Sequence, residues 1–412
     1  MKRVVITGLG CLTPIGATVP EFRDSLFEGR TGIGPIGLLP EAIDGSNGIR
    51  FSQMAAIADF DPDQHFSSGV ITATNPTAQY AIVAARQAAK QANLMSHHAS
   101  EDIAIILGCS TGGRSSEEVE TAKLYYRNAR VHPLTVTRTM ASAGASHVSI
   151  DLGITGPVLA ITTACASATH AIGLAFQMVR SGAVTAAITG GHEAPLTFGF
   201  LRAWDSIRVV SPTSCRPFAK DRDGMTLGEG AAMFVLETLD SALARNAQIF
   251  GEIVGFGMSA DATHITQPQS AGAARAMRKA LADANAFPEE VGYINAHGTG
   301  TQANDQVEAA AIHETFGPLG STIPVSSTKG LHGHSMGATG AVEALATILA
   351  LKEQDLPANA GITSAEQVDP TLNLDIILGE PRVADLDKPI ALSNSLAFGG
   401  LNAVLAFRHY TP

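Results

Sequence analysis

An apolar strand, a turn and an Ala-rich helix follow one another at two comparable places in this chain, and this repeated order constrains the fold most strongly. In the first half, "VLAI" at 158–161 predicts a buried strand and leads through a turn into "HAIGLAFQMV". In the second half, "IPVSSTK" leads through "GLHGHSMG" into "ATGAVEALATILAL". Strands that alternate with helices predict largely parallel sheets with helical cover.

Each half also opens on a glycine-rich strand, "RVVITGLG" at the N-terminus and "GEIVGFGMSAD" near residue 250. No low-complexity linker divides the chain. We therefore expect two related α/β halves, residues 1–250 and 251–412. If the halves pack about a pseudo-two-fold axis, the two strand-to-helix junctions converge on one site.

The composition excludes several classes of function. The chain of 412 residues has a net charge of −11 and no block of Lys or Arg, which argues against nucleic acid as a main partner. No run of about 18 apolar residues and no signal-peptide pattern is found, so we expect no membrane segment. The four cysteines form no CxxC pattern, which favours the reducing cytoplasm over a disulfide framework.

Cys165 lies in "TTACASATH", where the strand at 158–161 gives way to a helix. Free N–H groups and the positive end of the helix dipole at such a position favour a thiolate. The alternative is that Cys165 only packs in the core, as many free cysteines do.

Two further strand ends carry polar side chains that a cysteine enzyme could use. His297 follows the strand "VGYINA", and Lys329, His332 and His334 follow "IPVSST". A cysteine can hold an acyl group as a thioester, and two neutral imidazoles can donate hydrogen bonds to a second thioester carbonyl. A nearby lysine would keep those imidazoles neutral. This set suits decarboxylative carbon–carbon bond formation.

Other motifs suggest competing functions. "GHSMG" matches the nucleophile pattern of serine hydrolases with Ser335 as nucleophile, although the only later histidine is His409. "ITGLGCLT" imitates a dinucleotide fingerprint but has Thr13 at the third glycine position, so its glycines are expected to allow a tight turn. "GCSTGGRSS" lacks the Walker lysine and is expected to be a turn that lines a pocket. No metal site is expected, since no carboxylate or cysteine stands at ligand spacing from the histidines.

Five blocks resemble one known family. "TTACASATHAIG", "RPFAKDRDGMTLGEGA", "NAHGTGT", "SSTKGLHGHSMGATGAVEA" and "NSLAFGGLNAVLAF" are similar to motifs of the elongating β-ketoacyl-acyl carrier protein synthases of the thiolase superfamily. The blocks come in the family's order across nearly the whole chain. The resemblance implies a thiolase fold of two related halves in a five-layer αβαβα sandwich, and a homodimer, with a heterodimer as the alternative.

The resemblance also implies residue roles and partners. Cys165 would take the acyl chain from acyl carrier protein, and His297 and His334 would bind the malonyl thioester and promote its decarboxylation. Lys329 would support the site, with Glu343 as its ion-pair partner. Phe398 would gate the acyl pocket, and its N–H with that of Cys165 would form the oxyanion hole. Further residues implied to bind substrate or to anchor the site are Thr299, Thr301, Asp305 and Gly399. The substrates arrive on phosphopantetheine, and no separate cofactor is implied.

Several positions depart from the family pattern. Leu396, Ala397 and Leu401 replace the usual Phe, Gly and Thr of the C-terminal loop, and Met225 replaces a Phe. The usual carrier-docking Lys and Arg residues are absent between residues 67 and 79, so the expected docking residues are Arg127, Arg130, Arg202 and Arg208. These changes suggest specialised polyketide, polyene or modified fatty-acid synthesis. Cys165, His297 and His334 together argue against a non-catalytic chain-length partner.

Overall fold

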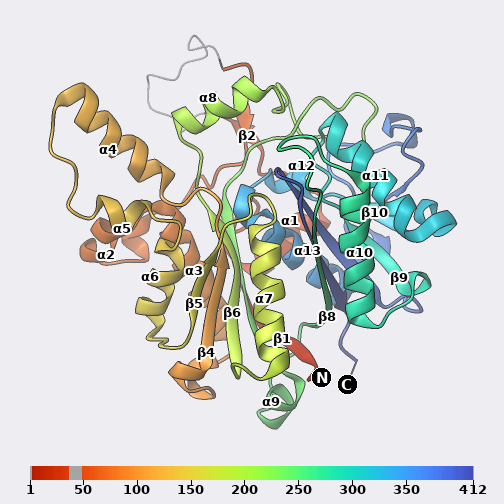
Figure 1. Cartoon of the computed structure of the whole chain (residues 1–412), viewed down its shortest axis with the longest axis horizontal. Coiled ribbons are helices and arrows are strands. Elements are labelled where there is room, and N and C mark those ends of the chain that lie inside the picture. The colour runs from red at the N-terminus through yellow and green to blue at the C-terminus, as the bar shows by residue number, and fades with distance from the viewer. Residues whose placement is uncertain (1, 37–48, 412) are drawn as a thin grey trace.

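The strands of the two halves occur in the same spatial order. The computed structural model describes residues 2–36 and 49–411, and in this part of the chain eleven strands form one sheet (Figure 1). The first half contributes β1 (Val4–Leu12), β4 (Ile103–Gly108), β5 (Val158–Ile161), β6 (Ala186–Glu193) and β7 (Gly230–Thr238). The second half contributes β8 (Gly251–Ala260), β9 (Val291–Asn295), β10 (Pro324–Ser326), β12 (Asp375–Ile376), β14 (Ile390–Ala397) and β15 (Leu401–Arg408).

The sheet order reveals an internal repeat. The first half runs β1-β7-β6-β4-β5 and the second runs β8-β15-β14-β9-β10, with β12 beyond β10. Corresponding neighbours also pair in the same sense, since β6, β4 and β5 are parallel, as are β14, β9 and β10. The halves join where β1 and β8 pair as antiparallel strands.

The prediction of largely parallel sheets is only half right. In each half the remaining strands are antiparallel, for example β14 and β15, which form a hairpin. A tight turn such as Gly399–Gly400 can join only antiparallel strands, because a parallel pair needs a long crossover. The pattern of alternating strands and helices did not include this hairpin.

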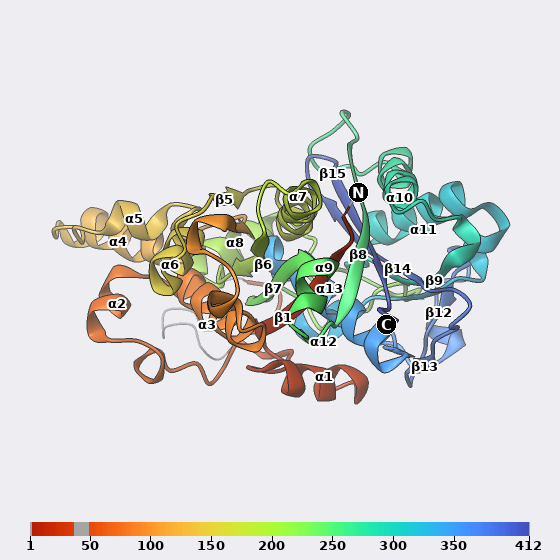
Figure 2. The ribbon, with the colours of Figure 1, turned by 90° about the horizontal axis from the view of Figure 1, so that it is seen from below.

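The two halves of the sheet form two layers, and helices form three more, one outside each half and one between the halves; Figure 2 shows them from below. On the outside of the first half lie α3 (Pro76–Gln91) and α6 (Ala143–Leu152), and on the outside of the second lie α10 (Ser270–Ala284) and α11 (Gln302–Phe316). Between the halves lie α7 (Ser167–Ser181) and α13 (Thr339–Glu353), which contact each other and strands of both halves. The five-layer α/β arrangement expected from the resemblance is thus present.

The shorter elements lie at the edges of these layers. They are α1 (Val19–Phe27), α2 (Ser68–Ala73), α4 (Arg114–Arg127), α5 (Thr135–Thr139), α8 (Phe198–Ile207), α9 (Leu239–Ala244) and α12 (Lys329–His332), with the strand pairs β2 (Gly34–Pro35) and β3 (Gln53–Met54), and β11 (Asp355–Leu356) and β13 (Arg382–Val383). Across the described residues, no helix combines the length and apolar character that crossing a bilayer requires.

The glycines of "ITGLG" have a packing role, so the expectation of a tight turn there is wrong. Gly8 and Gly10 lie inside the continuous strand β1, and a Cβ on either would overlap backbone carbonyl oxygens of α3. Gly255 and Gly257 of β8 meet α10 in the same way. Both halves therefore use paired glycines to bring a helix close to the first strand, which further supports the repeat.

The strand before Cys165 is exposed rather than buried. β5 forms an edge of the described sheet and pairs only with β4. Leu159 is 47% exposed, because β5 is the last strand of the sheet and no further strand of the described residues covers its outer edge. The apolar run "VLAI" correctly predicted a strand, but the burial inferred from it was wrong.

Candidate active site

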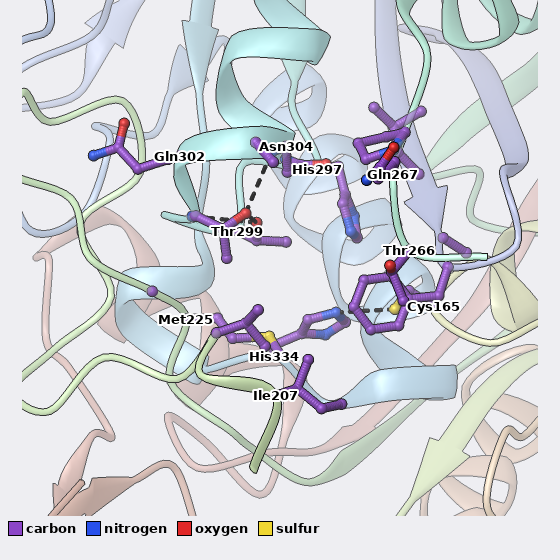
Figure 3. Close-up of a pocket in the computed structure, with 18 of the residues that line it drawn as sticks. Cys165, Ile207, Met225, Thr266, Gln267, His297, Thr299, Gln302, Asn304 and His334 are labelled. Carbon is purple, nitrogen blue, oxygen red and sulfur yellow. Dashed lines mark hydrogen bonds between the residues drawn. The ribbon is translucent and has the colours of Figure 1, made fainter. Parts of the chain in front are cut away.

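Four segments that are far apart in the sequence meet in one cavity of about 420 Å³. They are the β5–α7 junction with Cys165, the loop after β9 with His297, the β10–α13 junction with His334, and the β14–β15 turn with Phe398. Figure 3 shows the cysteine and both histidines facing the same space. The internal repeat explains part of this convergence, because β5–α7 and β10–α13 are equivalent junctions.

Cys165, His297 and His334 form a tight buried cluster. The Sγ atom of Cys165 lies 3.2 Å from Nε2 of His334 (Figure 3). The two imidazole rings are nearly perpendicular, with centroids 5.4 Å apart. One nitrogen of each ring and the sulfur all lie within 4.8 Å of one another. Groups bound at the sulfur and at the rings could therefore reach reacting distance.

The hydrogen bonds at the far side of each ring determine which nitrogen carries the proton. The backbone N–H of Met336 donates to Nδ1 of His334 at 3.2 Å. The ammonium group of Lys329 lies 3.3 Å from Nδ1 of His297 and also donates to the carbonyl oxygen of His297. Because both Nδ1 atoms face donors, we assign the ring proton to Nε2 in each case. Both Nε2–H groups are then available to the cavity.

Burial and the charge of Lys329 together keep the two rings neutral. Burial lowers the pKa of both His297 and His334 well below 6.5, and the positive charge of Lys329 lowers it further. Lys329 is itself fully buried and forms the expected ion pair with Glu343. Burial raises the pKa of Glu343 to about 7, against the opposing effect of Lys329. The rings are therefore neutral hydrogen-bond donors at physiological pH.

The thiol of Cys165 is protonated, contrary to the thiolate expected from its position. Burial raises its pKa to about 11, while Lys329 and the backbone N–H groups of Phe398 and of Cys165 itself lower it less strongly. The start of α7 at Ser167 therefore does not outweigh the loss of solvation. These same N–H groups face the sulfur, where an oxyanion of a bound thioester could form.

Two buried carboxylates that the sequence reasoning missed hold the catalytic loops. Glu308 of α11 accepts hydrogen bonds from the N–H groups of His297 and Gly298, each at 2.8 Å. Glu193 at the end of β6 accepts from the N–H groups of Ser110 and Gly337. A glutamate within the Ala-rich stretch "DQVEAAAI" was the one sequence signal that could have identified Glu308.

The other residues implied by the resemblance divide into cavity and support positions. Thr299 and Thr301 line the cavity. Asp305 is buried and accepts hydrogen bonds from the N–H groups of Phe218 and Gly300, so it anchors two loops. Asp305, Glu343 and Gly399 are absent from the cavity wall, where Gly400 lies instead. A direct contact of those three residues with a molecule in the cavity is therefore not supported.

The cavity also contains side chains that the sequence analysis did not single out. Trp204 stacks on Phe398, with ring centroids 5.7 Å apart and an angle of 19° between the planes. The other newly identified lining residues include Ile207, Ile265, Thr266, Gln267, Gln302 and Asn304. The loop "GCSTGGRSS" was expected to line a pocket, but within the described residues it does not line this cavity and instead binds Glu193.

The competing motifs are not supported by the geometry. Ser335 is buried and its hydroxyl has no hydrogen-bond partner among the described residues, so no base activates it. Cys165, His297 and His334 converge in space as expected, although no ligand spacing links them in the sequence. A metal-bound histidine presents a lone pair to the metal and donates its other N–H to an acceptor. Here the far nitrogens of His297 and His334 face donors, which is the opposite arrangement.

One of the four arginines expected to dock the carrier lies at the cavity. Arg208 directly follows α8, lines the cavity and is exposed to solvent. Arg127, Arg130 and Arg202 do not line the cavity within the described residues. Arg208 is therefore the candidate that a bound prosthetic arm could contact.

The chain is similar to known proteins in both sequence and structure. The family models described as "Beta-ketoacyl synthase, N-terminal domain" and "Beta-ketoacyl synthase, C-terminal domain" match residues 1–242 and 250–363. The chain is 40% identical to Nodulation protein E of Rhizobium sp. (strain N33) over 410 residues, which cover 99% of both chains. It is also 40% identical to 3-oxoacyl-[acyl-carrier-protein] synthase 2 of Staphylococcus aureus (strain COL), again with 99% of both chains covered. The ishigamide ketosynthase/chain length factor structure aligns over the full length of both chains with a TM-score of 0.92 and 34% identity.

Proposed function

We propose that this chain, which belongs to the β-ketoacyl synthase family, carries an acyl group on Cys165 and extends it with a malonyl unit that His297 and His334 bind. The family membership establishes the reaction class, a decarboxylative condensation on acyl carrier protein. The proposal concerns which residues perform each step. It places the nucleophile in residues 1–250 and both histidines in residues 251–412.

The first step is acyl transfer to Cys165. The sulfur bonds to the acyl carbonyl carbon, the bond from that carbon to the carrier's pantetheine sulfur breaks, and the thiol proton passes to the departing sulfur. The N–H groups of Cys165 and Phe398 stabilise the oxyanion that forms on the carbonyl oxygen. The Nε2–H of His334, 3.2 Å from the sulfur, stabilises the thiolate character that develops there.

The second step is decarboxylation and condensation. Nε2–H groups of His297 and His334 donate to the malonyl thioester carbonyl, so the enolate that forms as CO₂ leaves is stabilised. His297 also assists the departing carboxyl group through water. The enolate carbon then bonds to the acyl carbon, the Cys165 sulfur leaves, and one proton is taken up to restore the thiol.

One observation carries this proposal: both imidazoles are neutral, present Nε2–H to the cavity, and lie within 4.8 Å of the cysteine sulfur. Decarboxylation forms an enolate without removal of a proton from the substrate. Neutral hydrogen-bond donors are therefore sufficient to stabilise it, and no base is needed. A hydrolase would need a base beside its nucleophile, and Ser335 has none among the described residues.

The proposal extends to partners and compartment. Arg208 would contact the prosthetic arm of acyl carrier protein, and the exposed edge strand β5 supports a dimer with an identical or related chain. We infer that the reaction uses no cofactor beyond the phosphopantetheine of the carrier. We also infer that the protein acts in the cytoplasm. Met225, Leu396 and Ala397 depart from the family pattern and line the cavity, which supports a specialised acyl substrate.

The test uses intact-protein mass spectrometry. The purified chain is incubated with acyl carrier protein bearing acyl groups, and then with malonyl carrier protein. We expect an acyl adduct on Cys165, followed by 3-ketoacyl product and loss of the adduct. Cys165→Ala should form neither, while Cys11→Ala, which alters a buried thiol of β1, should behave as the wild type. An adduct on Cys165→Ala, or labelling of Ser335 by a fluorophosphonate, would contradict the proposal.

A further inference from the structure

Trp204 is the single tryptophan of this chain, and it lies in the wall of the active-site cavity. It is placed near the end of α8 (Phe198–Ile207). Its indole stacks on the Phe398 ring, with centroids 5.7 Å apart and planes inclined by 19°. The two rings therefore make an offset-stacked aromatic pair, the arrangement that aromatic side chains prefer.

The Trp204 side of this pair is anchored. Phe200 contacts the indole edge-on, with centroids 5.9 Å apart. Phe200 is only 8% exposed and belongs to a buried cluster with Phe51, Leu201, Met225, Leu227 and Met336, against which Trp204 packs. Trp204 is thus held by a helix and a packed core.

The Phe398 side of the pair is followed by a glycine turn. Gly399 and Gly400 follow it with φ values of 83° and 66°, a region that glycine adopts without strain. The N–H of Gly399 donates to the carbonyl oxygen of Ile265 at 2.7 Å, and the carbonyl oxygen of Gly400 accepts from the N–H of Asp261 at 2.9 Å. These bonds hold the turn, so the Phe398 ring, which precedes it, can leave the indole by rotation of its own side chain while Trp204 stays in place.

We propose that Trp204 is a positioning residue that holds Phe398 in its stacked position beside the Cys165 thiol and so limits how easily a bulky group reaches the sulfur. The backbone N–H of Phe398 faces that sulfur, so any shift of the residue changes the surroundings of the thiol. The inference rests on the proposed function, in which the acyl chain must pass to Cys165.

The expected size of the effect follows from the aromatic pair. Loss of such a contact shifts a two-state equilibrium by about 2- to 10-fold. Trp204→Leu should therefore raise the population of the displaced Phe398 by this factor. Trp204→Phe keeps a stacking ring and should stay close to the wild type.

Alkylation of Cys165 tests this without any condensing activity. Cys165 is 8% exposed, whereas Cys11, Cys109 and Cys215 are exposed by 1% or less, so it is the thiol that reacts in the folded protein. The readout is the rate with a bulky N-aryl maleimide divided by the rate with iodoacetamide, which cancels changes in thiol pKa. The ratio should rise about 2- to 10-fold in Trp204→Leu and return to the wild-type value in Trp204→Phe. Phe287→Leu, which alters an exposed ring outside the cavity wall, should leave the ratio unchanged.

A second measurement covers the case in which Trp204→Leu does not fold. The emission of Trp204, excited where tyrosine does not absorb, should shift when the bulky maleimide modifies Cys165, because Phe398 leaves the indole. In Phe398→Leu the emission should already be shifted and should not respond to modification. An unchanged ratio in Trp204→Leu, equal ratios in the Leu and Phe variants, or an unchanged wild-type emission would each overturn the proposal. If the proposed function is wrong but Trp204 does hold Phe398, the alkylation ratios and the emission shift would still be as expected, and only condensation would be absent.

Discussion

Replacement of Lys329 by methionine tests how the buried ion pair supports the imidazoles of His297 and His334. Lys329 is fully buried, contacts Nδ1 and the carbonyl oxygen of His297, and pairs with Glu343. Lys329→Met fills a similar space but removes the charge and all three contacts. Glu343 then has no counterion, and Nδ1 of His297 loses its donor.

The effect on stability should depend on pH in a defined direction. Removal of one partner of a buried pair costs about 3–5 kcal/mol when the other stays charged. In the wild type the pKa of Glu343 is about 7, raised by burial and lowered by Lys329, so without Lys329 it rises further. A carboxyl whose folded pKa is raised binds its proton more tightly in the folded state, and stability falls as pH rises towards that folded pKa. Below about pH 7, Glu343 is protonated in both the wild type and Lys329→Met, so the stability of both falls equally as the pH rises. Above about pH 7, Glu343 stays protonated only in the variant, whose stability continues to fall by about 1.4 kcal/mol per pH unit.

The assay is urea unfolding of both proteins near pH 6 and near pH 9, with Lys329→Met/Glu343→Gln as the matched control. The double variant has no buried charge at this place, so its stability should recover, and the additional loss between pH 6 and pH 9 that distinguishes Lys329→Met from the wild type should be absent. Its condensation rate should remain low, by about 10²- to 10³-fold, because His297 still lacks the donor that fixes its tautomer.

Two results would refute this reasoning. A stability loss of equal size near pH 6 and near pH 9 would mean that Glu343 does not take up a proton in the variant. Recovery of condensation in the double variant together with stability would mean that Lys329 has only a structural role and does not act through His297.

Three other predictions follow from the geometry. His297→Ala should still form the acyl adduct on Cys165 but should decarboxylate malonyl carrier protein about 10²- to 10³-fold more slowly, and an equal loss in both steps would contradict the separate roles. Because burial raises the pKa of Cys165 to about 11, its alkylation by iodoacetamide should accelerate about tenfold per pH unit from neutral to about pH 10, and a plateau near pH 8 would disprove a raised pKa. Gly10→Ala should destabilise the fold by about 1–3 kcal/mol in urea unfolding, because a Cβ there overlaps the backbone of α3. Gly34→Ala, whose Cβ would meet open space, should leave the stability unchanged. Equal effects of the two substitutions would refute the close-packing role of Gly10.

Features that depend on neighbouring residues could be predicted from the sequence. The strand-to-helix junctions at Cys165 and His334 and the strand before His297 lie where the apolar patterns placed strands and helices. The family resemblance, which depends on five local motifs, was confirmed by the matching family models and relatives. Even the repeat of the two halves was visible as a similar order of strands and turns.

Burial and electrostatics could not be read in this way. The edge position of β5, the packing role of Gly8 and Gly10, and the raised pKa of Cys165 each contradicted a local expectation. In each case the outcome depends on groups that are distant in sequence, such as α3 for the glycines and the remote segments that bury the Cys165 thiol.

The amino-acid order alone thus determined which elements form, in what succession, and which reactive side chains stand at their ends, since these properties follow from periodicity and turn chemistry within short windows. Only the folded chain decided that a sulfur and two rings lie within 4.8 Å, that both rings present Nε2–H, and that an unforeseen indole stacks on Phe398. The physical reason is that proton affinity, tautomer and ring stacking depend on distance and on exclusion of water, and packing sets both between segments that are remote in sequence.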